Sequence, residues 1–186
     1  AFRPPRSLPS LVEELLRLCP RSPVLVVDDG SGEAWASLFR DLDARPRVRV
    51  LRHAVNLGKG QALKTGLNEV LLAYPDALGV VTVDADTRLD PQGLSFLRER
   101  FVDPDVGAVA GNAKVGNRRN LLTRWQALEY VASQNLDRRA FEVLEALPVV
   151  PGAVGAWRRR ALLEVGGFPP ETLAEDADAT LTLLRR

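Results

Sequence analysis

The chain has 186 residues, of which 46% are hydrophobic and 26% are charged, as is typical of one globular domain. Its formal net charge of +1 and its scattered basic residues exclude the strongly basic character that favours nucleic-acid binding. The single cysteine, Cys19, excludes an internal disulfide, and no apolar run approaches the roughly 20 residues that a membrane-spanning helix needs.

Apolar periodicity predicts helices and strands that alternate along the chain. Ser10 and Glu13 have the spacing of a capping box for the first helix, and Pro91 is expected in the first turn of a later one. In chain order we expect a helix over 8–18, strands over 24–27 and 47–51, a helix over 61–73, a strand over 79–83, a helix over 91–101, a strand over 106–110, and helical segments over 121–147 and up to residue 184.

Two of these strands are nearly continuous apolar runs, as expected for strands covered on both faces. The pattern therefore predicts an α/β fold with a doubly wound, mainly parallel sheet and helices on both faces. Ligands of such sheets lie at the carboxyl ends of the strands. No strand precedes the first helix, and Met is absent even at position 1. We therefore expect 1–186 to be a single domain from a longer chain; either its first strand lies upstream of this segment, or its sheet is one strand short.

Acidic residues follow the two apolar strands. Asp28 and Asp29 end the first, and Asp84 and Asp86 end the second. If the strand ends converge, these carboxylates repel each other, and a divalent cation relieves the conflict. Oxygen ligands favour Mg²⁺ or Mn²⁺, which use one or two carboxylates together with water and diphosphate oxygens. The alternative is that Asp-Gly and Asp-Ala-Asp only form turns after strands.

Three further segments are candidates for chemistry. The segment 56–61 opens a helix with glycines and with Lys59, as an anion-binding site would, although this signal alone is weak. Asp176 begins another helix within Glu-Asp-Ala-Asp, either as a general base or only as part of an acidic first turn. The small-residue segment 151–157 reads as a turn that could wrap a sugar.

Three other side chains have less certain roles. Trp157 and Phe168 could stack on a sugar or belong to the core. His53 follows a strand, and we expect it to face solvent or cap an element rather than to act in catalysis.

In this order the segments resemble the inverting family 2 glycosyltransferases, which have the GT-A fold of nucleotide-diphospho-sugar transferases. The matching sequences are VVDDGS, NLGKGQALKTGL, VDADT, VPGAVGAWRR, EVGGF and TLAEDADATLTL, and they cover most of the chain from Val24 onward. Within this family, the motifs are most similar to those of the membrane-associated polysaccharide synthases. The usual first-strand motif is represented only by a tail at 1–4, and the carboxyl-terminal Gln-x-x-Arg-Trp motif of processive members is absent. The resemblance therefore implies a domain without its first strand and its carboxyl-terminal part.

The resemblance implies a role for each matching residue. Asp28 and Asp29 would lie at the nucleotide base and ribose, and Lys59 would face the diphosphate. Asp84 would hold the nucleotide and Asp86 the metal, as in a DxD motif. Asp176 would be the catalytic base.

The same resemblance implies an activity and a location. A metal-dependent enzyme would transfer a sugar, with inversion, from a nucleotide-diphospho-sugar that we expect to be UDP-linked to a hydroxyl of a glycan or lipid-linked acceptor. Polysaccharide or glycoconjugate synthesis would take place in the cytoplasm, at the inner face of the cell membrane, and nucleic acid would not be a partner. The full protein would be membrane-associated through parts outside this segment.

Two other classes of function stay open. A sugar-nucleotide nucleotidyltransferase also uses carboxylates and metal, but would begin with a Gly-rich loop at its amino-terminal strand, which is not seen here. A degenerate module that only binds a nucleotide would have no use for a base at Asp176.

Overall fold

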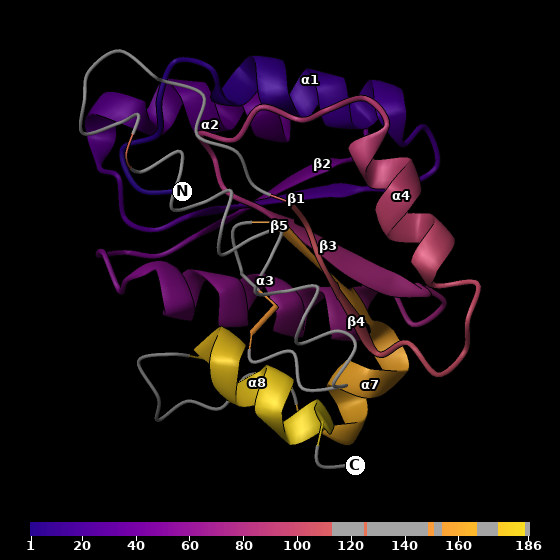
Figure 1. Cartoon of the computed structure of the whole chain (residues 1–186). Coiled ribbons are helices and arrows are strands. Elements are labelled where there is room, and N and C mark those ends of the chain that lie inside the picture. Colours follow the sequence, from indigo (N-terminus) through magenta and orange to yellow (C-terminus); the bar gives the residue numbers. More distant parts are fainter. Residues whose placement is uncertain (113–124, 126–148, 151–153, 167–174, 185–186) are drawn as a thin grey trace.

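The computed structural model describes residues 1–112, 125, 149–150, 154–166 and 175–184, with side chains in the last range from residue 180 onward. Helices and strands alternate through most of it, as Figure 1 shows. The elements are α1 (Leu8–Leu18), β1 (Val24–Asp28), the 3-10 helix η1 (Glu33–Trp35), α2 (Ala36–Asp43), β2 (Val48–Arg52), α3 (Lys59–Ala73), β3 (Gly79–Val83), α4 (Gly93–Arg100), β4 (Ala108–Ala110), β5 (Val154–Arg158), α7 (Arg159–Glu164) and α8 (Glu175–Leu184).

The strands form two hydrogen-bonded sheets, one of β1 and β2 and one of β3, β5 and β4, which lie between layers of helices (Figure 1). β1 and β2 are parallel, in a register that sets Val24 opposite Val48 and Asp28 opposite Arg52. β5 lies between β3 and β4 and is antiparallel to both. The predicted α/β class is confirmed, but the described ladders are mixed rather than mainly parallel.

The mixed pairing arises because residues from Val154 onward form β5, where the sequence suggested a sugar-wrapping turn. The small side chains of this segment are typical of a turn. They also fit a strand that lies between two other strands, as β5 does. The backbones approach closely, because a Cβ on Gly79 would meet the Trp157 carbonyl oxygen at 2.5 Å. Trp157 itself is fully buried, so it belongs to the core and does not stack on a sugar. Phe168 lies outside the described residues.

Helices cover both faces of the strands. α1 and α2 pack on one face of β1 and β2, and their buried residues form one core cluster: Leu8, Leu11, Val12, Val26, Phe39, Leu42 and Val48. α3 packs on the other face, where a Cβ on Gly66 would lie 3.2 Å from the Val27 side chain. Alternate residues of β1 therefore face opposite helix layers, as the continuous apolar run predicts.

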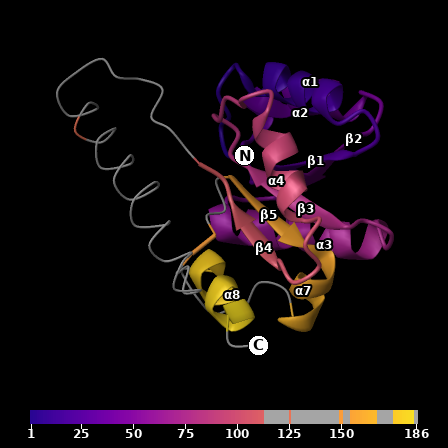
Figure 2. The same cartoon turned by 45° about the vertical axis from the view of Figure 1, so that its right-hand side comes forward.

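A second core cluster lies between α3, α7 and the strands around β5 (Figure 2). Leu67 of α3, Val150, Trp157 and Leu162 are buried in it, and Leu183 of α8 packs against it. The Thr180 hydroxyl accepts a hydrogen bond from the Val150 amide at 2.9 Å, which fixes α8 beside the strand layer. Within the described part of the chain, no helix is long and apolar enough to span a membrane.

Several predicted boundaries need correction. α1 begins at Leu8 after Ser7, which makes no side-chain cap, so the expected capping box of Ser10 and Glu13 is wrong. Pro91 precedes the Gln92 N-cap of α4 rather than lying in its first turn. α2 was not predicted, and the predicted helix over 121–147 lies outside the described residues except at position 125.

The edge of β1 opposite β2 is occupied by the first residue of the chain. The Ala1 nitrogen donates to the Val27 carbonyl, and the Asp29 amide donates to the Ala1 carbonyl at 2.8 Å. This is the hydrogen-bond pattern of a parallel strand neighbour. The segment resembling the tail of the first-strand motif therefore lies where such a neighbour of β1 belongs, and a preceding strand stays a prediction.

Candidate active site at the strand ends

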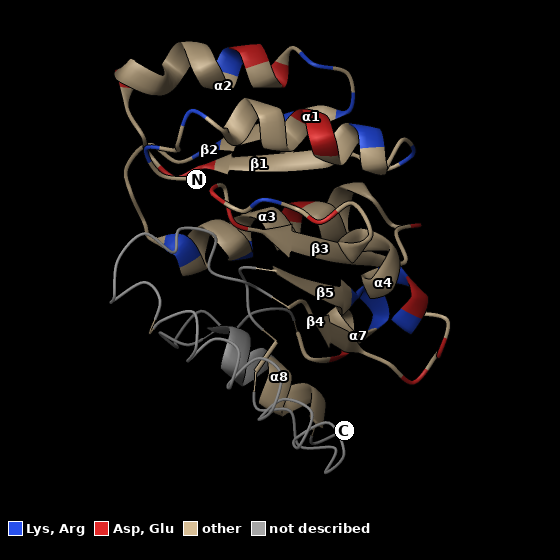
Figure 3. Cartoon of the chain, turned by 45° about the horizontal axis from the view of Figure 1, so that its top comes forward, with Lys and Arg blue, Asp and Glu red and all other residues tan. Residues whose placement is uncertain are grey.

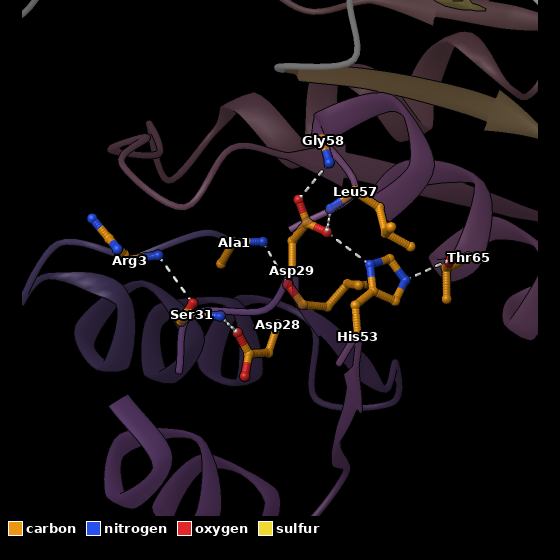
Figure 4. Close-up of polar contacts among 10 residues, drawn as sticks. Ala1, Arg3, Asp28, Asp29, Ser31, His53, Leu57, Gly58 and Thr65 are labelled. Atoms are coloured by element: carbon orange, nitrogen blue, oxygen red, sulfur yellow. Dashed lines mark hydrogen bonds and ion pairs between the residues drawn. The ribbon is translucent and has the colours of Figure 1, made fainter. Parts of the chain in front are cut away.

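Asp28 closes β1 and holds the turn that follows it. Its side chain is buried, and its Oδ1 accepts the Ser31 amide at 3.0 Å, an Asx-turn contact that Asp commonly makes. The Ser31 hydroxyl in turn accepts the Arg3 amide at 3.0 Å (Figure 4). The turn and the start of the chain are thus joined by hydrogen bonds.

Gly30 lets this turn pack directly against the segment that precedes α3. Its φ is +71°, and a Cβ there would lie 2.2 Å from the Val55 carbonyl carbon and 2.5 Å from the Asn56 nitrogen. No other residue type fits both the backbone conformation and the space. The turn after β1 and the loop before α3 are therefore in direct contact.

Asp29 binds the loop before α3 with both carboxylate oxygens. Oδ1 accepts the Leu57 amide at 2.9 Å and lies 2.7 Å from Nδ1 of His53, while Oδ2 accepts the Gly58 amide at 2.9 Å (Figure 4). Burial acts to raise the pKa of this carboxyl, but the hydrogen bonds from Leu57, His53 and Gly58 outweigh it and lower the pKa below its usual range. Asp29 is therefore held as a charged, enclosed acceptor.

His53 is the residue that the sequence interpretation placed wrongly. Its side chain is only 10% exposed rather than facing solvent, and it bridges Asp29 to Thr65 of α3, whose Oγ1 lies 2.9 Å from Nε2. The parallel register explains this position. Arg52 pairs with Asp28, so the residues that follow them, His53 and Asp29, lie side by side. That His53 is not catalytic stays a prediction.

Lys59 and Asp84 meet between α3 and the end of β3. Lys59 Nζ lies 2.8 Å from Asp84 Oδ2, and the two side chains are 58% and 32% exposed. The predicted diphosphate ligand and the predicted nucleotide ligand are therefore in contact, and both are accessible from solvent.

Asp86 follows in the turn after β3. The Thr87 amide donates to the Asp84 carbonyl at 3.0 Å and closes this turn, which leaves Asp86 exposed. Within the ranges that the structure describes, no group of three His, Cys, Asp or Glu residues forms a metal cage. The carboxylates of the partly exposed Asp84 and the exposed Asp86 nevertheless fit a cation of the Mg²⁺ type, which typically takes one or two carboxylates and completes its shell with water and diphosphate.

The strand ends bring most of the predicted residues to one edge. β1 and β3 end on the same side of the molecule, where acidic segments follow both strands (Figure 3). Lys59 links the two strand ends, because Asp29 binds the loop directly before it and Asp84 binds its Nζ. Asp176 lies in the first turn of α8, whose side chains at 175–179 are outside the described residues, as are 151–153 and 167–174.

The family sequence model described as "Glycosyltransferase like family 2" matches residues 1–186. Among curated relatives, the poly-beta-1,6-N-acetyl-D-glucosamine synthase of Staphylococcus epidermidis RP62A is 27% identical over 158 residues, 84% of this chain and 37% of that protein. The synthase of the same name in Staphylococcus aureus COL is 26% identical over 154 residues, 82% of this chain and 36% of that protein. The chain thus spans little more than a third of these relatives.

Two solved structures have the same fold. The mannosyltransferase PcManGT from Pyrobaculum calidifontis, in complex with GDP-Man and Mn²⁺, matches with a TM-score of 0.56 and 23% identity over 94% of this chain and 48% of that one. TarS from S. aureus matches with a TM-score of 0.57 and 18% identity over 97% of this chain and 53% of that one. The predicted GT-A fold is confirmed.

Proposed function

Because this chain belongs to the glycosyltransferase like family 2, we propose that it is the donor-binding and catalytic domain of a transferase that moves a sugar from a nucleotide-diphospho-sugar to a hydroxyl acceptor. One observation carries the proposal: Lys59 lies 2.8 Å from Asp84, at the edge where β1 and β3 both end in carboxylates. A cation next to acidic strand ends is what a metal-bound diphosphate requires, because the cation and the metal share its negative charge.

The donor would lie along this edge. Asp28, at the buried end of β1, is our candidate for the nucleoside. Lys59 and the start of α3 would receive the diphosphate, because the first N–H groups of a helix lack intrahelical partners and attract anions. Asp84 and Asp86 would hold Mg²⁺ or Mn²⁺, and the metal would supply positive charge for the departing diphosphate. The relative solved with GDP-Man and Mn²⁺ supports a donor and a metal of these classes.

The transfer itself would be a single displacement. Asp176 would accept the proton of the acceptor hydroxyl as that oxygen attacks the anomeric carbon, and the bond to the diphosphate would break. Lys59 would stabilise the charge that develops on the leaving diphosphate. Since no protein nucleophile takes part, the anomeric configuration inverts.

The relatives also support a product class. Two curated relatives are poly-beta-1,6-N-acetyl-D-glucosamine synthases, so we propose polysaccharide or glycoconjugate synthesis with a UDP-linked donor and a glycan or lipid-linked acceptor. We place the full-length protein at the cytoplasmic face of the cell membrane, on its resemblance to the polymer synthases. Recovery of the full-length protein wholly in the soluble fraction would contradict that location.

A panel of sugar nucleotides tests the proposal. Incubation of the full-length protein with UDP-, GDP- and dTDP-sugars should release nucleoside diphosphate from one class of donor, and chelation of divalent metal should abolish the release. Accumulation of pyrophosphate with a sugar phosphate and nucleoside triphosphate as substrates would instead indicate a nucleotidyltransferase. Binding without any turnover, even with acceptor sugars present, would indicate a module that only binds the nucleotide.

A further inference from the structure

Asp29 lies at the junction of three segments: the end of β1, the end of β2 and the loop before α3 (Figure 4). We propose that Asp29 is a positioning residue of the donor site, which acts with His53 and Thr65 through the start of α3 and does not itself contact the nucleotide. The inference rests on the proposed function, and it differs from the role at the base and ribose that the family resemblance assigns to Asp29.

The carboxylate of Asp29 is enclosed by the protein, and both of its oxygens have partners. Its side chain is 3% exposed, Oδ1 is shared by the Leu57 amide and the His53 ring, and Oδ2 accepts the Gly58 amide. A carboxylate can accept about four hydrogen bonds and Asp29 takes part in three, so access rather than capacity is the limit. Because its side chain is only 3% exposed, Asp29 would have to break one of these charge-assisted hydrogen bonds to turn toward a ribose hydroxyl or a base. Breaking such a bond inside the protein costs free energy. We therefore expect another group to contact the nucleoside.

Asp29 binds the segment that directly precedes Lys59, the cation of the proposed diphosphate site. Leu57 and Gly58 directly precede Lys59, the first residue of α3. Gly58 is the N-cap of this helix, has a φ of +94° and makes no side-chain cap. A glycine in this region has many accessible conformations, so the bonds from Asp29 select one of them. The direction of the first turn of α3, and with it the place of Lys59 beside Asp84, depends on Asp29.

His53 adds a second attachment to the same helix. One ring nitrogen lies 2.7 Å from Asp29 Oδ1, and the other lies 2.9 Å from Thr65 Oγ1. Thr65 belongs to a later turn of α3, so the helix is attached both at its start and further along. Because His53 directly follows β2 and Asp29 directly follows β1, the register of the two strands fixes the positions of the two residues that hold α3.

Binding of UDP and of UMP, each in the presence of Mn²⁺, tests this role by calorimetry on the full-length protein. UMP has the base and ribose but not the diphosphate. We expect Asp29→Asn to raise the Kd of UDP roughly tenfold, the size of one charge-assisted hydrogen bond. The Kd of UMP should change by less than about twofold, since other groups hold the nucleoside. Equal weakening of both nucleotides would overturn the proposal, because it would show that Asp29 contacts the nucleoside.

Two further variants separate positioning from a general loss of stability. His53→Gln should shift UDP binding in the same direction as Asp29→Asn, with UMP again little affected. Arg158→Gln is the matched control, because Arg158 pairs with Gly79 at the start of β3, the end of the strand opposite to the site. It should lower stability without weakening UDP. A similar loss of UDP affinity in the control would show that the effect of Asp29 is only structural.

Hydrogen exchange in the unliganded protein tests the attachment without any nucleotide. In Asp29→Asn and His53→Gln, exchange of the peptide 54–60 should rise by about tenfold, and exchange of the peptide 24–28 should stay unchanged. Unchanged exchange at 54–60 would contradict this inference. A rise in exchange together with no UDP or GDP binding by the wild-type protein would contradict the proposed function instead.

Discussion

Lys59 and Asp84 form an ion pair of 2.8 Å although they are 25 residues apart, one at the start of a helix and the other after a strand. The pair is partly exposed, so its net contribution to stability is small, about 0–1 kcal/mol. We propose both partners as ligands of the donor, and a diphosphate would compete with Asp84 for the lysine. On this proposal the contact serves ligand binding more than the stability of the fold.

Replacement of this lysine tests that view. Lys59→Gln should weaken UDP binding by roughly tenfold or more and leave UMP binding nearly unchanged, because only the diphosphate needs the cation. Calorimetry with both nucleotides measures the difference, and urea denaturation should show a change of less than about 1 kcal/mol in the free energy of unfolding. An equal loss for both nucleotides would contradict a role at the diphosphate. Lys64→Gln, on the same helix, is the control.

Asp86 should be required for the metal-dependent part of nucleotide binding. Its side chain is exposed after β3, where hard carboxylate oxygens suit Mg²⁺ or Mn²⁺. Asp86→Ala should abolish the dependence of UDP binding on Mn²⁺ and leave the circular dichroism spectrum and the melting temperature unchanged. Unaltered affinity in the presence of metal would show that the assignment is wrong. Asp90→Ala, with another exposed carboxylate, serves as the control.

Acid should weaken the fold partly through Asp29. The pKa of this carboxyl is lowered in the folded protein, so its contribution to stability is present above the unfolded value of about 3.9 and is lost as pH falls through the folded value. Asp29→Asn cannot titrate, so it should be less stable at pH 7 and lose less additional stability between about pH 4 and pH 2. Urea denaturation across this range measures the slope. A slope equal to that of the wild type would contradict a lowered pKa.

Arg158 should matter for stability alone. Its guanidinium donates to the carbonyls of Phe101, Asp103 and Val106 at 3.1, 2.6 and 2.7 Å, and it lies over the Phe101 ring. Arg158→Gln leaves three carbonyls, two of them in partly buried contacts, without their cation, which should cost about 1–3 kcal/mol. Chemical denaturation measures the loss, and nucleotide binding at low temperature should be retained. Unaltered stability would mean that water replaces the guanidinium without cost.

The elements that the sequence predicts well are those with strong local signals. β1 and β3 are continuous apolar runs, and both strands lie where the sequence places them because burial on two faces demands such runs. Their carboxylates follow at one sheet edge, so the convergence of Asp28, Asp29 and Asp84 could be inferred before the structure. α1 was also expected, but its capping box was placed inside the helix, since Ser and Glu occur within helices as well as at their starts.

Other features depend on contacts between distant segments, which local patterns do not contain. β5 has small residues that look like a turn, and only its place between β3 and β4 makes it a strand. His53 looked like a solvent-facing residue because no local signal links it to Asp29 or Thr65. The link follows from the parallel register of β1 and β2, which a sequence pattern suggests only after the two strands are paired.

Asp176 separates an enzyme from a module that only binds a nucleotide. A general base acts on the acceptor rather than on the donor, so Asp176→Asn should leave UDP binding nearly intact. Transfer should fall by roughly two to four orders of magnitude, the usual contribution of general acid–base catalysis. Calorimetry measures the first quantity, and transfer to an acceptor by the full-length protein measures the second.

Glu175→Gln is the matched control, because it removes the neighbouring carboxylate at the start of the same helix. It should cost much less transfer than Asp176→Asn. If Glu175→Gln loses transfer while Asp176→Asn keeps near wild-type transfer, then Glu175 is the general base and Asp176 is not. If both variants transfer sugar at the wild-type rate, neither carboxylate is the base, and the displacement proposed here must take its proton acceptor from another residue.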